Sequence, residues 1–458
     1  MSGSSTSIEG KILSAKFTNE STVVTFVVNH QPKNTPFQTC FNNLFLRDSS
    51  RSANSVDPKT GQKMYTTGRL AAKPIHTIPN SMQISPDGMF LNISWKDNDS
   101  YDYPLEFFYK YKGCSFMTRS IRKQFSKHRP VIWNARVFNE SAIESDFAVK
   151  YDDFVKNDAA LYDTLIKLQK YGLALITDIP QNGLAGPDMM RTMVCRVGPL
   201  RRTTLNAVFE VNNLTEDHSH IGLTNLALPM QTDFQYMENV PGFKFLYCVK
   251  NQTHSGESIF VDGYNVAREL KEADVQAYEA LKAVPINYEY KIPGKCFYYE
   301  SRPLIEEFDA NEQNIESHNF EYLIKHVNYS PSFQAPFTYG IYNKLRSDSG
   351  REASLFSNET SLENCQHTNP GKVVERYAFR KFVRGLTLFE DMVNDPVNQF
   401  KLKIPENSCI LINNRRILQG RTLVDADDKT KQRLMYGCYL DTDNFRSRLK
   451  AFEESDMA

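Results

Sequence analysis

Hydrophobic and polar positions alternate in several short stretches of this chain, which is the pattern of half-buried β-strands. The clearest stretch is 243–250, FKFLYCVK, and it follows the turn residues Pro241 and Gly242. Residues 11–17, 22–28 and 89–95 follow the same alternation. The pattern therefore predicts a chain rich in β-sheet.

Helical periodicity is confined to a few segments. A leucine stripe after Asp158 ends at Gly172, where a glycine typically terminates a helix, and the apolar run 173–177 reads as a buried strand. A second helix is predicted from Pro187 to the stop at Gly198, and a third over 265–281. Because the rest alternates short strands with loops, we predict a mainly β fold with helices on its outside.

The length of 458 residues suggests two domains. Residues 1–112 are predicted to form a small β-rich N-terminal domain, 113–140 a connector, and 141–458 the main domain. The connector is basic and contains Trp133. Its charges are interpreted as a solvated face because aromatic residues are not interleaved with them.

Charge and cysteine usage narrow the possible partners and compartment. Lys and Arg total 54, as do Asp and Glu, so no net charge favours nucleic acid or a membrane surface as a partner. The apolar runs are too short to span a bilayer. The eight cysteines form no C-x-x-C pair, which is typical of free thiols in a reducing compartment. We expect a cytoplasmic protein with small-molecule or protein partners, because the N-terminus matches neither a secretory signal nor a presequence.

Four separated motifs carry a family resemblance. They are Gln231-Thr232-Asp233, the FVDGY segment 260–264, the LINNRRILQGR segment 411–421, and the RLMYGCYLDTD segment 433–443. Together they resemble the gamma-butyrobetaine and trimethyllysine dioxygenases, TauD-like enzymes that depend on Fe(II) and 2-oxoglutarate. The resemblance implies a double-stranded β-helix, or jelly roll, for residues 141–458. It also implies a possible homodimer and makes a mitochondrial location the alternative to the cytoplasm.

The iron ligands of the resembling family are two histidines and one carboxylate, which hold Fe(II) on one face. The resemblance places Gln231, Asp233 and Gln419 at these three positions, so both histidines are replaced by glutamine. An amide oxygen is a weak, non-basic donor. Losing even a partner that orients a ligand typically costs about ten- to a hundredfold in metal affinity, so we expect ordinary Fe(II) binding to be impaired.

The cosubstrate and substrate positions also follow from the resemblance. Arg433 and Ser258 are expected to bind a carboxylate of 2-oxoglutarate, and Arg421, from the segment 411–421 that also contains Gln419, is a further candidate for binding the cosubstrate. Phe209 and Leu223 match the positions of an aromatic cage for a trimethylammonium group. Since leucine has no π face, betaine or trimethyllysine is a poor guess for the substrate. A small-molecule carboxylate is the expected ligand.

Two further segments are weak candidates for metal sites. Residues 41–48, FNNLFLRD, resemble a strand of the family's N-terminal domain, where cysteines and a histidine often bind zinc. Serines follow in this chain, and His76 alone does not make a tetrahedral site, so zinc is not expected. The EDHSH segment 216–220 is predicted to be a solvated loop.

Three functional hypotheses therefore stay open. The first is an oxygenase of this family, active or residually active, with Fe(II) and 2-oxoglutarate as cofactor and cosubstrate. The second is a pseudoenzyme of the same fold that binds a dicarboxylate or a protein partner. The third is a structural homodimerising scaffold. Because function depends on the site and not on the fold, the sequence leaves open whether the chain is an enzyme.

Overall fold

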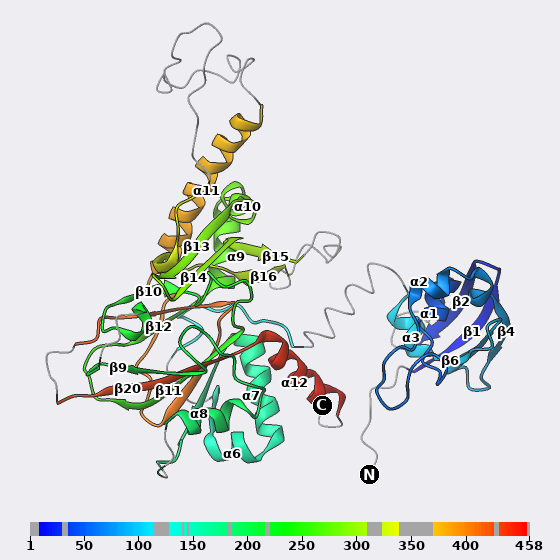
Figure 1. The fold of residues 1–458 in the computed structure, drawn as a ribbon, viewed down its shortest axis with the longest axis horizontal. Helices are drawn as coiled ribbons and strands as arrows, with labels where there is room; N and C mark the ends of the chain where they lie inside the picture. Colours follow the sequence, from blue (N-terminus) through cyan, green and yellow to red (C-terminus); the bar gives the residue numbers. More distant parts are fainter. Residues whose placement is uncertain are drawn as a thin grey trace, which may run out of the picture. The chain divides into compact units, whose positions relative to one another are not determined.

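A computed structural model gives the structure of the chain, which divides into two compact units, Met1–Phe125 and Ser126–Ala458 (Figure 1). The described residues are 9–29, 35–112, 128–139, 142–143, 146–181, 183, 186–215, 220–308, 323–338, 370–425 and 430–455, with side chains from residue 378 onward in the segment that starts at 370. Among these residues, no helix combines the length and the apolar character needed to cross a membrane.

The N-terminal unit consists of two three-stranded antiparallel sheets and short helices. The first sheet has β1 (Gly10–Phe17), β2 (Ser21–Val28) and β3 (Phe37–Asn42), and the second has β4 (Pro79–Ile84), β5 (Phe90–Trp95) and β6 (Ser100–Pro104). The helices are α1 (Asn43–Asp48), α2 (Thr67–Ala71), η1 (Pro74–Thr77) and α3 (Leu105–Lys110). Every second residue of β2 is buried, as its alternating sequence predicts. The unit has a hydrophobic core of its own that includes Trp95 and Tyr103.

The prediction of a strand over 41–48 is wrong beyond Asn42. There β3 ends and α1 begins, because the Asn42 side chain accepts a hydrogen bond from the N–H of Leu44 and caps the helix. Arg47 of this helix pairs with Asp97 at 2.8 Å. His76 lies in η1, and the serines that follow α1 hydrogen-bond Asp99.

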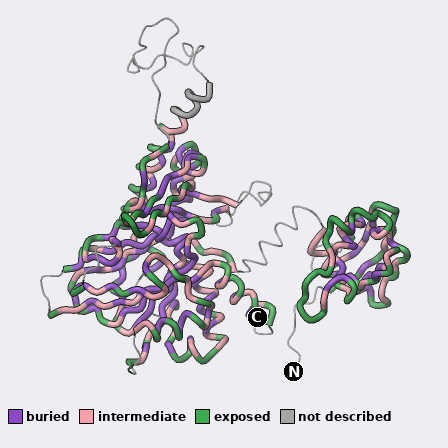
Figure 2. Tube along the Cα trace, viewed as in Figure 1, coloured by how far each residue is buried: buried purple, intermediate pink, exposed green. Residues whose placement is uncertain are grey.

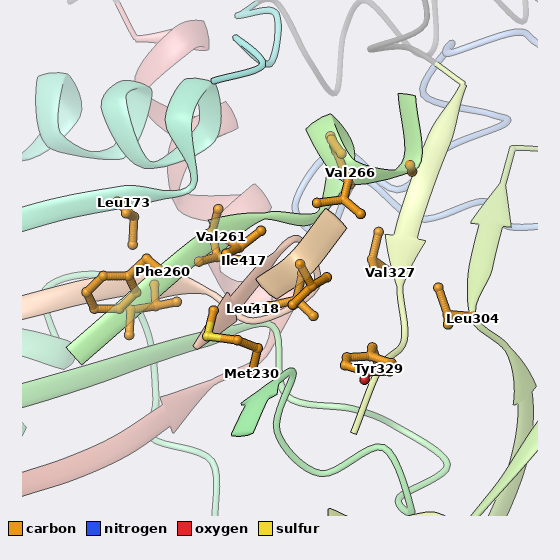
Figure 3. Close-up of a cluster of buried hydrophobic side chains, with 14 of the residues drawn as sticks. Leu173, Met230, Phe260, Val261, Val266, Leu304, Val327, Tyr329, Ile417 and Leu418 are labelled. Atoms are coloured by element: carbon orange, nitrogen blue, oxygen red, sulfur yellow. The ribbon is translucent and has the colours of Figure 1, made fainter. Parts of the chain in front are cut away.

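The second unit is built on two facing sheets. The six-stranded sheet has the order β7 (Ala148–Lys150), β8 (Leu173–Thr177), β18 (Ser408–Asn413), β11 (Phe243–Asn251), β20 (Arg433–Leu440) and β9 (Val208–Asn212). The four-stranded sheet has the order β10 (Leu228–Gln231), β19 (Ile417–Arg421), β12 (Ser258–Asp262) and β17 (Phe400–Leu402). One hydrophobic cluster contains residues of both sheets, among them Leu173 of the six-stranded sheet and Phe260 of the four-stranded sheet, which Figure 3 shows. The predicted jelly roll is confirmed.

Helices cover the outer face of the six-stranded sheet. These are α6 (Tyr151–Lys156), α7 (Asp158–Tyr171), α8 (Gly186–Val194) and α12 (Thr442–Glu454). Their apolar side chains form a second cluster with Phe243, Phe245 and Tyr247 of β11. The predicted stop of α7 at Gly172 is confirmed, since Gly172 adopts the left-handed conformation with φ 76°.

The remaining elements form a group that includes α9 (Gly263–Ala273), α10 (Val275–Ala283) and α11 (Pro370–Asn394), which contact one another. The two-stranded sheets are β13 (Pro285–Ile292) with β14 (Cys296–Pro303), and β15 (Ile305–Glu307) with β16 (Ile324–Val327). Short 3-10 turns are η2 (Ile221–Leu223) and η5 (Pro331–Phe333). The single helix predicted over 265–281 is wrong. Asp274 is extended, caps α10 through Ala277, and separates α9 from α10.

The prediction that β11 is half-buried is also wrong. Residues 243–248 are all buried, and Figure 2 shows the purple strands inside the unit. One face of β11 meets the outer helices, while Leu246 and Cys248 on the other face belong to the cluster inside the jelly roll. Of the predicted connector 113–140, residues 128–139 pack in the second unit, where Trp133 is buried. Residues 113–127 lie outside the described residues.

Candidate functional site

The three predicted ligand positions come together at one edge of the four-stranded sheet. Gln231 and Gln419 are direct partners in the antiparallel register of β10 and β19. Asp233 follows β10, and its backbone is fixed by Asn414, which accepts from the Asp233 N–H at 2.7 Å and donates to its carbonyl at 3.0 Å. The next residue, Phe234, has φ 63°, a strained conformation for an aromatic residue.

Lys244 lies at the centre of this group, and sequence reasoning missed it. Its Nζ donates hydrogen bonds to Asp233 Oδ2 and to Gln419 Oε1, both at 2.8 Å. Tyr439, which is opposite Lys244 in the register of β11 and β20, donates from its hydroxyl to the same Asp233 oxygen at 2.8 Å. Gln231 Nε2 donates to Asp233 Oδ1 at 3.3 Å. An ammonium group therefore bridges two of the three positions at which the family resemblance places metal ligands.

The buried charges fix the protonation of Asp233. Burial by itself would raise the pKa of Asp233, but the charge and hydrogen bond of Lys244, together with the Tyr439 hydroxyl, leave that pKa below its usual value. Burial and the negative charge of Asp233 raise the pKa of Tyr439 well above its usual value. At neutral pH, Asp233 is consequently a carboxylate and Tyr439 a neutral hydrogen-bond donor.

The residues present do not fit an Fe(II) ion of the facial-triad type. Asp233 Oδ2 and Gln419 Oε1 already accept from an ammonium, so a metal ion in this place would have to displace Lys244 or lie beside its positive charge. The remaining amide oxygen, Gln231 Oε1, is buried and has no hydrogen-bond partner among the described residues. In the described part of the chain, no group of three or more His, Cys, Asp and Glu side chains could hold a metal.

The predicted cosubstrate residues line the same pocket. Arg433 is 3% exposed, and its Nε has no hydrogen-bond partner in the described part of the chain. Arg421 differs, since its guanidinium donates to the carbonyls of Thr224 at 2.5 Å and Leu226 at 2.7 Å. Burial and the nearby Arg421 charge lower the pKa of Arg433. Buried Ser258 also lines the pocket and faces Arg421 in the register of β12 and β19.

The wall opposite these polar groups is apolar. Phe209 and Leu223, the predicted substrate positions, both line the pocket, and the Phe209 ring stacks on Tyr439 with centroids 5.8 Å apart. The prediction of a solvated loop is wrong for His220, which is 7% exposed and lies 5.0 Å from Phe333 between ring centroids. Residues 216–219 lie outside the described residues. The cavity encloses about 40 Å³.

The family profile described as "Taurine catabolism dioxygenase TauD, TfdA family" matches residues 136–439. A probable oxidoreductase of Saccharomyces cerevisiae, AIM17, is 40% identical over 97% of this chain and 91% of its own length. Trimethyllysine dioxygenase of Gallus gallus is 24% identical, covering 88% of this chain and 81% of its own. Gamma-butyrobetaine dioxygenase of a Pseudomonas species is 22% identical, covering 89% of each chain. The chain belongs to the TauD, TfdA dioxygenase family.

Proposed function

We propose that this protein is an iron-independent member of its family, a pseudoenzyme whose pocket binds a small carboxylate. The observation that carries the proposal is Lys244 Nζ, which lies 2.8 Å from both Asp233 and Gln419. An ammonium group has three N–H donors, and these two contacts use two of them. The third can donate to a ligand oxygen. Lys244 therefore supplies a hydrogen-bond donor and a positive charge at the place where the family resemblance implies a metal ion.

The charge of the pocket supports an anionic ligand. Among the described residues that line it, Lys244, Arg421 and Arg433 are cations and Asp233 is the one carboxylate. This excess of positive charge opposes a trimethylammonium substrate, although relatives are named for trimethyllysine and gamma-butyrobetaine. Arg433 offers a buried guanidinium that a carboxylate can satisfy. We therefore assign the ligand to the class of 2-oxo acids and related small carboxylates.

The size of the cavity constrains how such a ligand binds. A volume of about 40 Å³ holds water but not a five-carbon dicarboxylate. Binding of 2-oxoglutarate consequently requires side chains of the apolar wall, such as Leu223 and Met435, to move. A three-carbon 2-oxo acid needs less movement, so pyruvate and 2-oxoglutarate are both to be tested.

The test combines metal and ligand titrations of the whole protein. Anaerobic addition of Fe(II) with 2-oxoglutarate is expected to give no visible charge-transfer band. With a chelator present, pyruvate or 2-oxoglutarate is expected to raise the melting temperature. Arg433→Met should abolish that increase, whereas Arg191→Met, which changes an exposed arginine of α8, should preserve it. A charge-transfer band that is lost in Asp233→Asn would refute the proposal, as would the absence of any carboxylate effect.

Metal binding can also be engineered to test the place of Lys244. The double variant Q231H/Q419H is expected to bind Fe(II) or Co(II) weakly, because the Lys244 ammonium remains between the ligands. The triple variant Q231H/Q419H/K244A is expected to bind the metal at least about tenfold more tightly, because it has no ammonium at the metal's place. Residues that only support a ligand already change metal affinity by roughly ten- to a hundredfold. Calorimetric titration measures both. Equal affinity of the two variants would show that Lys244 does not occupy the metal's place.

A further inference from the structure

A second pocket of the C-terminal unit lies outside the Lys244 site and shares no lining residue with it. It encloses about 570 Å³ and is lined by segments that are distant in the sequence. These segments are the loop before β11, the strands β14 to β16, the turn between β18 and β19, and the start of α12. The family resemblance and the proposed function leave this pocket without a role.

Arg415 is the buried cation of this second pocket. It is 8% exposed, and its backbone is held on both sides, by Asn413 and by Val327 at 3.0 Å each. Within the residues that the structure describes, Arg415 Nη1 is buried without a hydrogen-bond partner and the guanidinium forms no ion pair. Burial lowers the pKa of Arg415 to about 10, and nearby Arg302 adds to this effect while Glu306 opposes it. The fold thus holds a buried guanidinium whose donor capacity is not used.

The neighbouring Arg416 shows that unused donors are not a general feature of the arginines in this turn. Arg416 is 1% exposed and fully engaged, with a bidentate pair to Asp262 at 2.7 and 2.9 Å. It also donates to the carbonyls of Lys170 and Val131. Arg416 is therefore a structural arginine, whereas Arg415 is oriented toward a pocket and lacks such partners. A buried donor of this kind favours an acceptor from outside the chain.

The N-terminus of α12 contributes further donors. This helix has 13 residues, and its N-cap residue Asp441 makes no capping hydrogen bond, because the Asp441 carboxylate pairs with Arg201. Residues 442–444 of its first turn line the pocket. The first N–H groups of a helix have no partner within the helix and favour an anion. Arg302 of the same pocket has a buried Nε with no hydrogen-bond partner among the described residues, while its Nη2 donates to the carbonyl of Met237 at 2.6 Å.

Carboxylates also face the pocket, and most are engaged or exposed. Glu306 accepts from His326 at 3.1 Å and from Asn328 at 2.7 Å. Glu238 and Asp443 are exposed. Lys325 and Arg446 are exposed cations of the same lining. The buried part of the pocket is therefore rich in donors, and its acidic groups lie mainly at the surface.

We propose that this pocket, formed by Arg415, Arg302 and the N-terminus of α12, binds a phosphate group. A tetrahedral anion has oxygens in several directions, and these can accept from two guanidinium groups and from helix N–H groups at the same time. The group is either free phosphate or the phosphate of a small phosphomonoester, for which the volume leaves room. This site is independent of carboxylate binding at Lys244.

The test uses the whole protein with inorganic phosphate and, separately, glycerol 3-phosphate, against chloride at equal ionic strength. Phosphate is expected to raise the melting temperature of the wild type and to broaden its own ³¹P signal. Arg415→Met should abolish both effects, and Arg191→Met should retain them. Asp443→Asn removes a negative charge from the rim and is expected to tighten binding by roughly three- to tenfold. A tighter response to the phosphomonoester than to phosphate identifies the ester as the ligand class.

Two further measurements keep the test decisive. If the role of Arg415 is only structural, Arg415→Met should lower the melting temperature without phosphate, as we expect of Arg416→Met. We expect no such loss for Arg415→Met. Should Arg415→Met not fold, Asp443→Asn alone still discriminates, because its affinity must rise. Three outcomes would overturn the proposal. Unchanged affinity in Asp443→Asn, or equal responses of Arg415→Met and the wild type, would mean an adventitious ion only. No response of the wild type would mean that there is no site.

Discussion

Lys244 determines the character of the site at the scale of single residues. It is 8% exposed and makes its two hydrogen bonds to Asp233 and Gln419, which are themselves buried. Removing one partner of a buried ion pair leaves an uncompensated charge, which costs roughly 3–5 kcal/mol. Lys244→Met is therefore expected to lower the free energy of unfolding by this amount, as measured by urea denaturation. Lys250→Met, on the exposed part of the same strand, should change it by less than about 0.5 kcal/mol.

A second substitution separates the charge from the packing. In Lys244→Met, the Asp233 carboxylate stays buried without its ammonium, so Asp233→Asn added to this variant is expected to recover part of the loss. In the wild-type background, Asp233→Asn should instead be destabilising. If Lys244→Met were as stable as the wild type, the ammonium could not be buried between the two oxygens.

Seven of the eight site residues predicted from sequence line one pocket, and the eighth, Gln231, donates a hydrogen bond to Asp233 of that lining, but Lys244 was missed. Family motifs placed Gln231, Asp233 and Gln419, which the register of β10 and β19 brings together. In a half-buried strand, the alternation over 243–250 would place Lys244 on the solvent face. A strand covered on both faces has no solvent face, and only the helices packed outside β11 reveal this. The sequence feature that could have identified Lys244 is a single lysine in the otherwise apolar run 243–249, shortly after the predicted ligand Asp233.

At the scale of elements, Arg416 connects four segments of the chain. It lies in the turn between β18 and β19 and pairs with Asp262, the N-cap of α9. Its other donors reach the carbonyl of Lys170 near the end of α7 and that of Val131. Arg416→Met is expected to destabilise the protein by roughly 3–5 kcal/mol, because Asp262 would remain buried and charged. Urea denaturation of Arg416→Met beside Arg415→Met provides the comparison, and similar losses in both would contradict the assignment.

The elements that could be predicted from the sequence are those whose boundaries depend on a short local pattern. The strand 173–177 and the stop of α7 at Gly172 follow from an apolar run and one glycine, and both are confirmed. The helix α1 and the break between α9 and α10 depend on the side-chain caps of Asn42 and Asp274. Such residues also occur in loops and turns, so their capping role becomes evident only when the backbone around them is known.

At the scale of the whole molecule, long-range pairing explains why the jelly roll was predictable only through a family resemblance. Asp233 contacts Asn414, and Lys244 contacts Gln419, across more than 170 positions of sequence. Alternation of polar and apolar residues predicts strands but not their partners. The motifs supplied the partners, because the family resemblance that they carry implies a jelly roll. Arg415 and the start of α12 lie within two of these motifs, but neither motif implied a second pocket, because the pocket forms only where they meet Arg302 in the folded unit.

The stability of the molecule should depend on pH through His326, which lines the second pocket. Burial lowers the pKa of His326 to about 4, and the charges of Arg415 and Lys325 add to this effect against the opposing influence of Glu306. In the unfolded chain the histidine pKa is about 6.5, so between these values the unfolded state binds more protons than the folded one. The free energy of unfolding is therefore expected to fall as pH decreases from about 6.5 to 4.5, by roughly 2 kcal/mol from this residue.

Urea denaturation at about pH 7 and at about pH 4.5 measures the effect, because these values bracket the window. Glu306 stays ionised in the window, because hydrogen bonds with His326 and Asn328 lower its pKa although burial alone would raise it. In His326→Gln, the free energy of unfolding is expected to lose the part of its pH dependence that comes from residue 326. The other histidines are present in both proteins and contribute equally to both. A pH dependence identical in both proteins would mean that His326 titrates normally, and that the pocket is open enough to solvate its charge.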